Sequence, residues 1–203
     1  MRVEALSTRD RILQAAIQLF VDKGIRRVAM DEVAERSGVA RVTLYRYFAD
    51  REALVRAAFF APMESLEGLQ RDLASSDGLT VEGVLGAIGE RIAQQPAIDL
   101  PVHRDELEKL YPVLAAEYAE HRDTVAHRLI SWIFGLAEAS GRLRPGVRKE
   151  LVEGVVWDLL VNPHSIPAVR ESGIRARELY AALIDVLLYG MLSDDGSRGP
   201  GGA

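Results

Sequence analysis

The chain of 203 residues is long enough to bury a substantial core, and 48% of its residues are hydrophobic while 27% are charged. This composition excludes a fibrous or mainly disordered chain. The absence of cysteine excludes disulfides, thiolate metal sites and cysteine nucleophiles. Charged residues follow Met1 closely, and no apolar run reaches the roughly 18 residues of a membrane span, so we expect a cytoplasmic protein without a secretion signal or membrane anchor.

The formal net charge of −5 is distributed unevenly along the chain. Residues 1–60 carry eleven Lys and Arg against eight Asp and Glu, so the remaining residues hold all of the negative excess. Between residues 36 and 51, four arginines are accompanied by Asp50 as the single acidic residue. A basic segment of this kind is typical either of a nucleic-acid contact or of a solvated surface, and charge alone does not separate the two.

The first 50 residues predict three short helices and almost no strand. Ser7 or Thr8 begins the first helix and Gly24 ends it, and its inward positions are Ile12, Ala15, Ala16, Leu19 and Phe20. Two further helices are predicted at residues 30–37 and 41–47, with a break at Gly38 between them. Asp50 is positioned to cap the helix that follows.

The spacing of the second and third helices predicts a helix-turn-helix. Ala34 is small enough for two helices to cross there, and Gly38 tolerates positive φ in the turn. The outer face of the third helix then carries donors, a methyl group and aromatic hydroxyls that suit a DNA major groove, from Arg41, Val42, Thr43, Tyr45, Arg46 and Tyr47. The alternative is the polar surface of an ordinary helix pair.

The segment GVARVTLYRYFADREAL, which begins at Gly38, and the preceding MDEVA, which begins at Met30, resemble the DNA-binding domain of the TetR/AcrR transcriptional regulators. The likeness covers about residues 8–56. It departs from the family at Ala29 and Ala40, where relatives often have a capping Ser or Thr, and we expect slightly frayed helix starts there.

The resemblance implies roles for individual side chains. Arg41, Val42 and Thr43 are expected nearest the base edges, and Arg46 is expected at a base or a phosphate. The resemblance also implies phosphate contacts for Tyr45, Tyr47 and Arg51, so that replacing Arg51 with alanine would lower the salt dependence of DNA binding.

Beyond residue 50 the periodicity predicts an all-α body without a motif of its own. Helices are expected over residues 51–74, from Thr80 to Pro96, from Pro101 to about residue 111, from there to about residue 139, and over residues 147–161 and 176–192. Pro62 is expected to kink or split the first of them. The predicted domains, with about nine helices in all, are a helix-turn-helix DNA-binding domain at 1–54, a helical ligand-binding and dimerisation domain at 55–192 and a disordered tail at 193–203.

The last two predicted helices are apolar over an unusually wide arc. The resemblance implies that they pair with their copies in a homodimer, and the alternative is burial within the core of one monomer. The candidate interface residues are Leu151, Val155, Leu159, Leu179, Leu183, Val186 and Leu187.

The resemblance also implies a small-molecule effector among the central helices. Large aromatic, apolar and cationic side chains are the candidates for an apolar pocket, and for each the alternative is plain core or surface. They are Phe59, Met63, Arg104, Tyr111, Tyr118, Trp132 and Trp157.

No metal, cofactor or catalytic group is expected. His103 and Glu106 share a helix face, but His121 and His127 are six residues apart and point about 240° away from one another around their helix. The sequence also contains no phosphate-binding glycine loop, nucleophile elbow or H-E-x-x-H motif.

Together these features predict a transcriptional regulator and not an enzyme. The expected protein is a homodimeric repressor that binds a palindromic operator and is released by a small apolar or amphipathic effector. One alternative is a helical ligand-binding or enzymatic body that uses the DNA-binding domain only for localisation. Another is a DNA-binding protein with no ligand.

Overall fold

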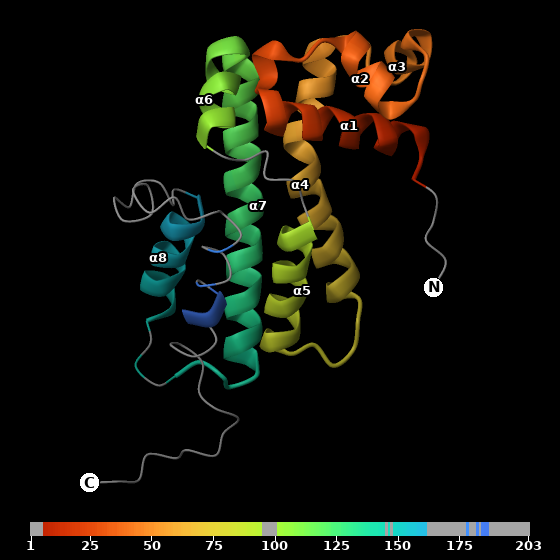
Figure 1. Cartoon of the computed structure of the whole chain (residues 1–203). Helices are drawn as coiled ribbons and strands as arrows, with labels where there is room; N and C mark the ends of the chain where they lie inside the picture. Colours follow the sequence, from red (N-terminus) through yellow and green to blue (C-terminus); the bar gives the residue numbers. More distant parts are fainter. Residues whose placement is uncertain are drawn as a thin grey trace, which may run out of the picture. The chain divides into compact units, whose positions relative to one another are not determined.

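The computed structural model describes residues 6–94, 101–144, 146, 148–161, 178, 182 and 184–186. These residues form helices and no β-strand, which confirms the predicted all-α class (Figure 1). No helix in this part of the chain is both long and apolar enough to span a membrane. The helices are α1 (Thr8–Lys23), the 3-10 helix η1 (Ile25–Arg27), α2 (Met30–Ser37), α3 (Arg41–Tyr47), α4 (Arg51–Ala74), α5 (Val81–Gln94), α6 (Pro101–Leu110), α7 (Pro112–Ala139) and α8 (Lys149–Val161).

The predicted starts and ends of the first helices are confirmed. Ser7 caps α1, because its Oγ accepts a hydrogen bond from the backbone N–H of Asp10 at 3.1 Å. Gly24, at φ +81°, closes α1, and Gly38 closes α2 in the left-handed region at φ +68°. Asp50 accepts a hydrogen bond on Oδ1 from the N–H of Ala53 at 2.8 Å and so caps α4 as expected.

Helix α4 continues through Pro62, so the proline does not split the helix, and the kink that was the other expected effect stays a prediction. Proline at this position removes one backbone donor, which weakens the helix locally. Side chains on both sides of it are nevertheless buried, with Phe59 fully inaccessible and Leu66 6% exposed. This burial stabilises the helical backbone on each side of the proline and offsets the lost hydrogen bond.

The chain divides into two compact units, of which the first comprises Met1–Glu64 with Gln95–Glu120 and the second Ser65–Gln94 with His121–Ala203. Helices α4 and α7 therefore contribute residues to both units. The N-terminal helices share the first unit with α6 and the beginning of α7, a grouping that the sequence did not indicate. The domain boundary predicted after residue 54 stays a prediction.

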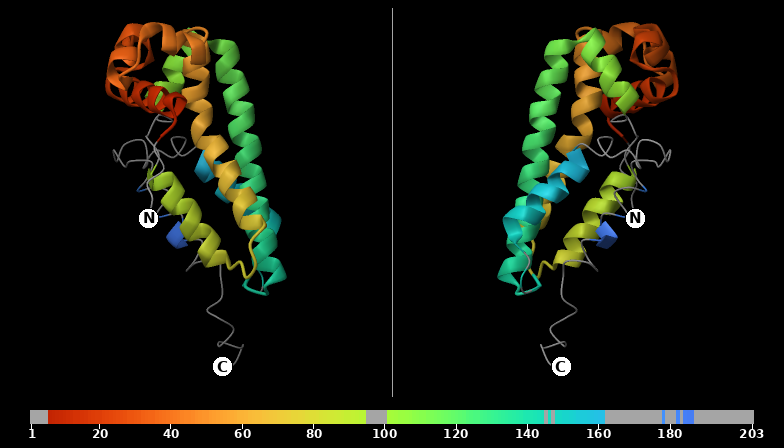
Figure 2. Two further views of the ribbon diagram at one scale, coloured as in Figure 1. Left: turned by 90° about the vertical axis from the view of Figure 1, so that its right-hand side faces the viewer. Right: turned by 90° about the vertical axis from the view of Figure 1, so that its left-hand side faces the viewer.

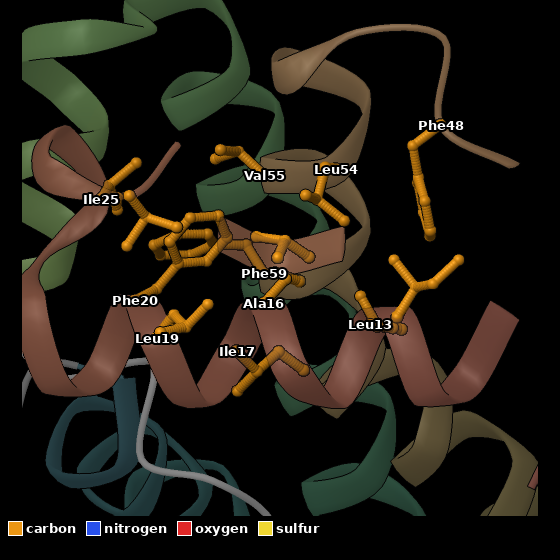
Figure 3. Packing of buried hydrophobic residues seen from close by; sticks show 14 of the residues in the cluster. Leu13, Ala16, Ile17, Leu19, Phe20, Ile25, Phe48, Leu54, Val55 and Phe59 are labelled. Atoms are coloured by element: carbon orange, nitrogen blue, oxygen red, sulfur yellow. The ribbon is translucent and has the colours of Figure 1, made fainter. Parts of the chain in front are cut away.

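A single hydrophobic core joins the elements of the first unit. Phe20 of α1 and Ile25 of η1 lie against residues of α4, among them Leu54, Val55 and Phe59 (Figure 3). Figure 2 shows the three helices α1, α2 and α3 gathered around the first turns of α4. Residues distant in sequence complete the same core from α6 and α7, namely Leu107, Leu114 and Tyr118. Each large apolar side chain that is fully buried here contributes about 1.5–3 kcal/mol to the stability of the folded state.

In the second unit, α7 packs against both α5 and α8. Residues Val81 and Leu85 of α5 contact Ala137 of α7. Val156 of α8 packs on Ile130 and Phe134 of α7. Two ion pairs also hold α7: Arg128 of α7 pairs with Glu67 of α4 at 2.9 Å, and Lys149 of α8 pairs with Glu138 of α7 at 2.9 Å.

A carboxylate from α6 caps the short helix η1 within the first unit. Oε2 of Glu106 accepts a hydrogen bond from the backbone N–H of Ile25 at 2.6 Å, across 81 residues of sequence. The preceding Gly24 lets the carboxylate approach, because a Cβ at that position would lie 2.8 and 2.9 Å from its two oxygens. The φ of +81° also disfavours any other residue at this position. The contact fixes the turn between α1 and α2 against α6.

Replacing Glu106 with alanine should therefore destabilise the protein by about 1–2 kcal/mol, because the N–H of the buried Ile25 loses its acceptor. Chemical denaturation followed by circular dichroism measures this loss. Glu106→Gln, which keeps an acceptor oxygen, should lose less, and Asp105→Asn at an exposed position of the same helix should change little. Equal stabilities for wild type and Glu106→Ala would show that the hydrogen bond contributes nothing.

Candidate nucleic-acid interface

The turn between α2 and α3 is closed by backbone hydrogen bonds. The N–H of Val39 donates to the carbonyl of Ala34 at 3.0 Å, and the N–H of Gly38 donates to Glu35 at 3.1 Å. This is the geometry of a helix that ends on a left-handed glycine. Beneath the turn Leu44 is fully buried and Phe48 is 3% exposed. Helix α3 is thus held on α2 by its inner side chains, which leaves its outer face free.

The six predicted DNA-contacting residues of α3 lie together on this short helix. Val42 is 82% exposed, Tyr47 40% and Tyr45 38%, and Arg41 and Arg46 are also exposed, while Thr43 is half-buried. An apolar side chain as exposed as Val42 loses nothing by entering a groove and gains by covering a thymine methyl. The helix therefore offers one apolar group among several hydrogen-bond donors.

Aromatic and acidic neighbours constrain the two arginines of α3. The guanidinium carbon of Arg41 lies 5.6 Å from the centroid of the Tyr45 ring, and that of Arg46 lies 5.5 Å from the Tyr47 ring. Arg41 also pairs with Asp31 of α2, with Nε 3.0 Å from Oδ1 and Nη1 donating to Oδ2 at 3.1 Å. The sequence alone does not indicate this ion pair, because its partners are ten residues apart on different helices.

The missing helix caps are confirmed. Neither Ala29, which precedes α2, nor Ala40, which precedes α3, supplies a side-chain hydrogen bond. Acidic residues in the first turn of α2, Asp31 and Glu32, interact favourably with the positive end of that helix. Helix α3 has no acidic residue in its first turn, so no side chain of that turn offsets the positive end of the helix dipole.

Known proteins share this N-terminal arrangement. Residues 12–58 match the family model of bacterial regulatory proteins of the tetR family. The HTH-type transcriptional repressor KstR2 of Mycolicibacterium smegmatis is 26% identical over 157 residues, which cover 75% of each chain. This chain therefore carries an N-terminal DNA-binding domain of the tetR type.

Solved structures of family regulators have the same fold. The ketosteroid transcriptional regulator KstR2 of Mycobacterium tuberculosis superposes with a TM-score of 0.60 at 16% identity, covering 94% of this chain and 98% of that one. A gamma-butyrolactone receptor superposes with a TM-score of 0.62 at 20% identity, covering 91% and 88%. This chain is a DNA-binding transcriptional regulator and not an enzyme, as its relatives are.

Arg51 of this regulator has an internal partner. The side chain is half-buried, and its Nη2 donates to the backbone carbonyl of Ile25. Its Nε is also buried and has no hydrogen-bond partner within the described part of the chain. The guanidinium therefore supports η1 at the carbonyl of Ile25, and the phosphate contact of Arg51 stays a prediction.

The predicted effector residues are divided between the two units. Phe59 and Tyr118 lie in the core of the first unit, with ring centroids 5.4 Å apart in an edge-to-face contact. Met63 and Tyr111 pack against the same core. These four side chains thus belong to or border a hydrophobic core, and a role in binding an effector stays a prediction for them.

The other three candidates have different surroundings. Arg104 is half-buried on α6 in the first unit. The two tryptophans belong to the second unit, where Trp132 is half-buried and Trp157 stacks on His127 with ring centroids 4.8 Å apart. Among the described residues, no cluster of three or more acidic or histidine side chains could hold a metal ion.

Replacing Arg51 with alanine should lower the free energy of unfolding by about 1–2 kcal/mol, since the carbonyl of Ile25 loses a charged donor. Urea denaturation measures the change. Arg46→Ala serves as the matched control, because its guanidinium is exposed and its loss should stay within about 0.5 kcal/mol. If Arg51→Ala left the stability unchanged and weakened the salt dependence of DNA binding, the result would favour a contact between Arg51 and a DNA phosphate over the internal role.

Proposed function

We propose that this regulator is a repressor that binds a palindromic operator as a homodimer and is released by a small apolar or amphipathic effector. The observation that carries the proposal is α3, a short helix whose inner residues are buried and whose outer face exposes an apolar side chain among donors. The related KstR2 of Mycolicibacterium smegmatis is described as a transcriptional repressor. Binding to a bacterial operator would place the protein in the cytoplasm.

The position of each side chain on α3 supports a division of labour. Arg41, Val42 and Thr43 occupy the first turn, which in helix-turn-helix proteins is nearest the base edges. A guanidinium donates to the two acceptors of guanine, and a valine methyl covers the methyl group of thymine. Tyr45 and Tyr47 follow in the next turn and suit phosphate oxygens, as does Arg46.

An uncovered apolar stripe on α8 supports the homodimer. Leu151 is 63% and Val155 52% exposed, whereas Val152 and Val156 of the same helix contribute to the packing against α7. One side of α8 thus covers the core of the second unit, and the adjacent stripe is left for a second copy. Of the other candidates, Leu159 is half-buried and Val186 is 61% exposed, and the remaining three lie outside the described residues: Leu179, Leu183 and Leu187.

A dimer also follows from what recognition requires. One helix of seven residues contacts only a few base pairs, which is too short a site to distinguish an operator from the rest of a genome. Two such helices related by a two-fold axis recognise two half-sites, and their operator is then a palindrome.

The effector proposal requires that ligand and operator favour different arrangements of the dimer. Coupling of this kind is reciprocal, so that each weakens the binding of the other by the same factor. Trp132, Trp157 and Arg104 remain the candidate contacts, because they are half-buried and lie outside the hydrophobic core of the first unit. A compound that binds the protein and leaves its operator affinity unchanged is not the effector.

Selection from a randomised DNA duplex pool should recover a palindrome, and Arg41→Ala should lose preference at one base pair of each half-site. The expected loss is about 1–3 kcal/mol per half-site, the usual worth of a bidentate contact. Sequencing of the bound fraction at two salt concentrations measures both effects. Binding that is steeply salt-dependent and recovers no motif would instead favour a domain used only for localisation.

Val155→Asp should weaken the homodimer at least tenfold, because a carboxylate would be buried in an apolar contact. Sedimentation at micromolar concentration measures the change against wild-type protein. Glu150→Gln, exposed at the start of the same helix, is the matched control and should leave the dimer intact. A wild-type protein that sediments as a monomer would contradict the proposed interface.

A further inference from the structure

We propose that Asp31 is a positioning residue that sets sequence specificity by keeping Arg41 away from DNA phosphates. This inference rests on the proposed operator binding through α3. It assigns a role to a side chain on α2, the helix that carries none of the predicted DNA contacts. The inference concerns selectivity between DNA sequences and not the existence of DNA binding.

Two side chains restrict the position of the Arg41 guanidinium. The Asp31 carboxylate uses both of its oxygens, with Oδ1 3.0 Å from Nε and Oδ2 accepting from Nη1 at 3.1 Å. The Tyr45 ring lies 5.6 Å from the guanidinium carbon. A free arginine side chain samples many rotamers, whereas one with two partners is restricted to few.

The pair is nevertheless exposed and exchangeable. The side chains of Arg41 and Asp31 are 64% and 63% exposed, so water screens their attraction and competing groups reach them easily. A guanidinium has five N–H donors, of which one, on Nη1, donates to the Asp31 carboxylate. The remaining donors are available to DNA without breaking the pair.

The chemistry of the two DNA acceptors then decides which contact survives. A phosphate is anionic, so it competes with the Asp31 carboxylate for the same positive charge, and the two anions repel one another. The O6 and N7 acceptors of guanine are uncharged and accept from the free donors while the ion pair remains in place. Asp31 therefore weakens the contact of Arg41 with phosphate, which every DNA sequence offers. It leaves intact the contact with guanine, which only some sequences offer.

Two simpler roles for Asp31 make different predictions. The carboxylate stabilises the N-terminus of α2, where Ala29 provides no cap, and this role affects only helix stability. Any acidic residue on α2 also repels DNA at long range, and Glu35, which is exposed on the same helix, does so equally. Neither of these roles requires Arg41.

The experiment is a double-mutant cycle with a matched charge control. Wild type, Asp31→Asn, Arg41→Ala, the double variant and Glu35→Gln are titrated against the selected operator and a scrambled duplex of equal length, by fluorescence anisotropy at several salt concentrations. Asp31→Asn keeps the size of the side chain, and thermal melting by circular dichroism verifies that each variant is folded.

Asp31→Asn should raise affinity for the scrambled duplex about 3–10-fold, and more than Glu35→Gln does. The slope of log affinity against log salt should steepen by about 0.9 for each α3 helix bound, the value of one added phosphate contact. The ratio of operator to scrambled affinity should fall. In the Arg41→Ala background, Asp31→Asn should raise the affinity for the scrambled duplex no more than Glu35→Gln does.

Equal effects of Asp31→Asn with and without Arg41 would overturn the proposal and leave only long-range repulsion. An unchanged salt slope would overturn it as well. Failure of the proposed operator binding has a different signature, because wild-type protein would then bind the selected and scrambled duplexes equally. The scrambled-duplex titrations test Arg41 dependence even in that case.

Discussion

The structure depends on the backbone of Ile25, whose N–H and carbonyl are each bound by a polar side chain from another helix. Glu106 accepts from its N–H, and Arg51 donates to its carbonyl. Ile25 itself is fully buried in the core of the first unit. Backbone polar groups beside an apolar core are costly when unpaired, and here charged groups from two other helices satisfy both. The turn between α1 and α2 therefore has one defined conformation, and the direction of α2 and α3 follows from it.

The position of α3 depends on that turn. Helix α3 has only seven residues and would not be stable alone. The left-handed Gly38, the buried Leu44 and the buried Phe48 fix it on α2. Its exposed side chains can then be flexible or apolar without loss of the fold, and this separation of inner from outer residues permits a DNA-contacting face.

Local signals in the sequence predicted most of the fold. The caps at Ser7, Asp50 and Thr80 and the glycines that end α1 and α2 act within a few residues, so their effect can be recognised from spacing. The bounds of α2 and α3 were predicted correctly for this reason.

What the sequence failed to show is long-range. Nothing near Glu106 indicates that its partner is 81 residues away, and nothing near Arg51 indicates that its guanidinium is used internally. Similarly, Phe59 and Tyr118 resemble pocket residues in the sequence, because an apolar stripe looks the same whether it faces a ligand or a core. The Arg41 pair with Asp31 crosses a turn, a relation that helical periodicity does not contain.

The close approach of Gly24 to Glu106 also limits how the protein can be recombined. The two positions form a steric unit, since a side chain at position 24 would overlap the carboxylate at position 106. Chimeras that join the N-terminal helices of one family member to the remaining helices of another must therefore exchange both positions together. Compatibility between these parts is decided at a contact remote from the recognition helix, so operator preference and mutual fit of the segments can vary independently.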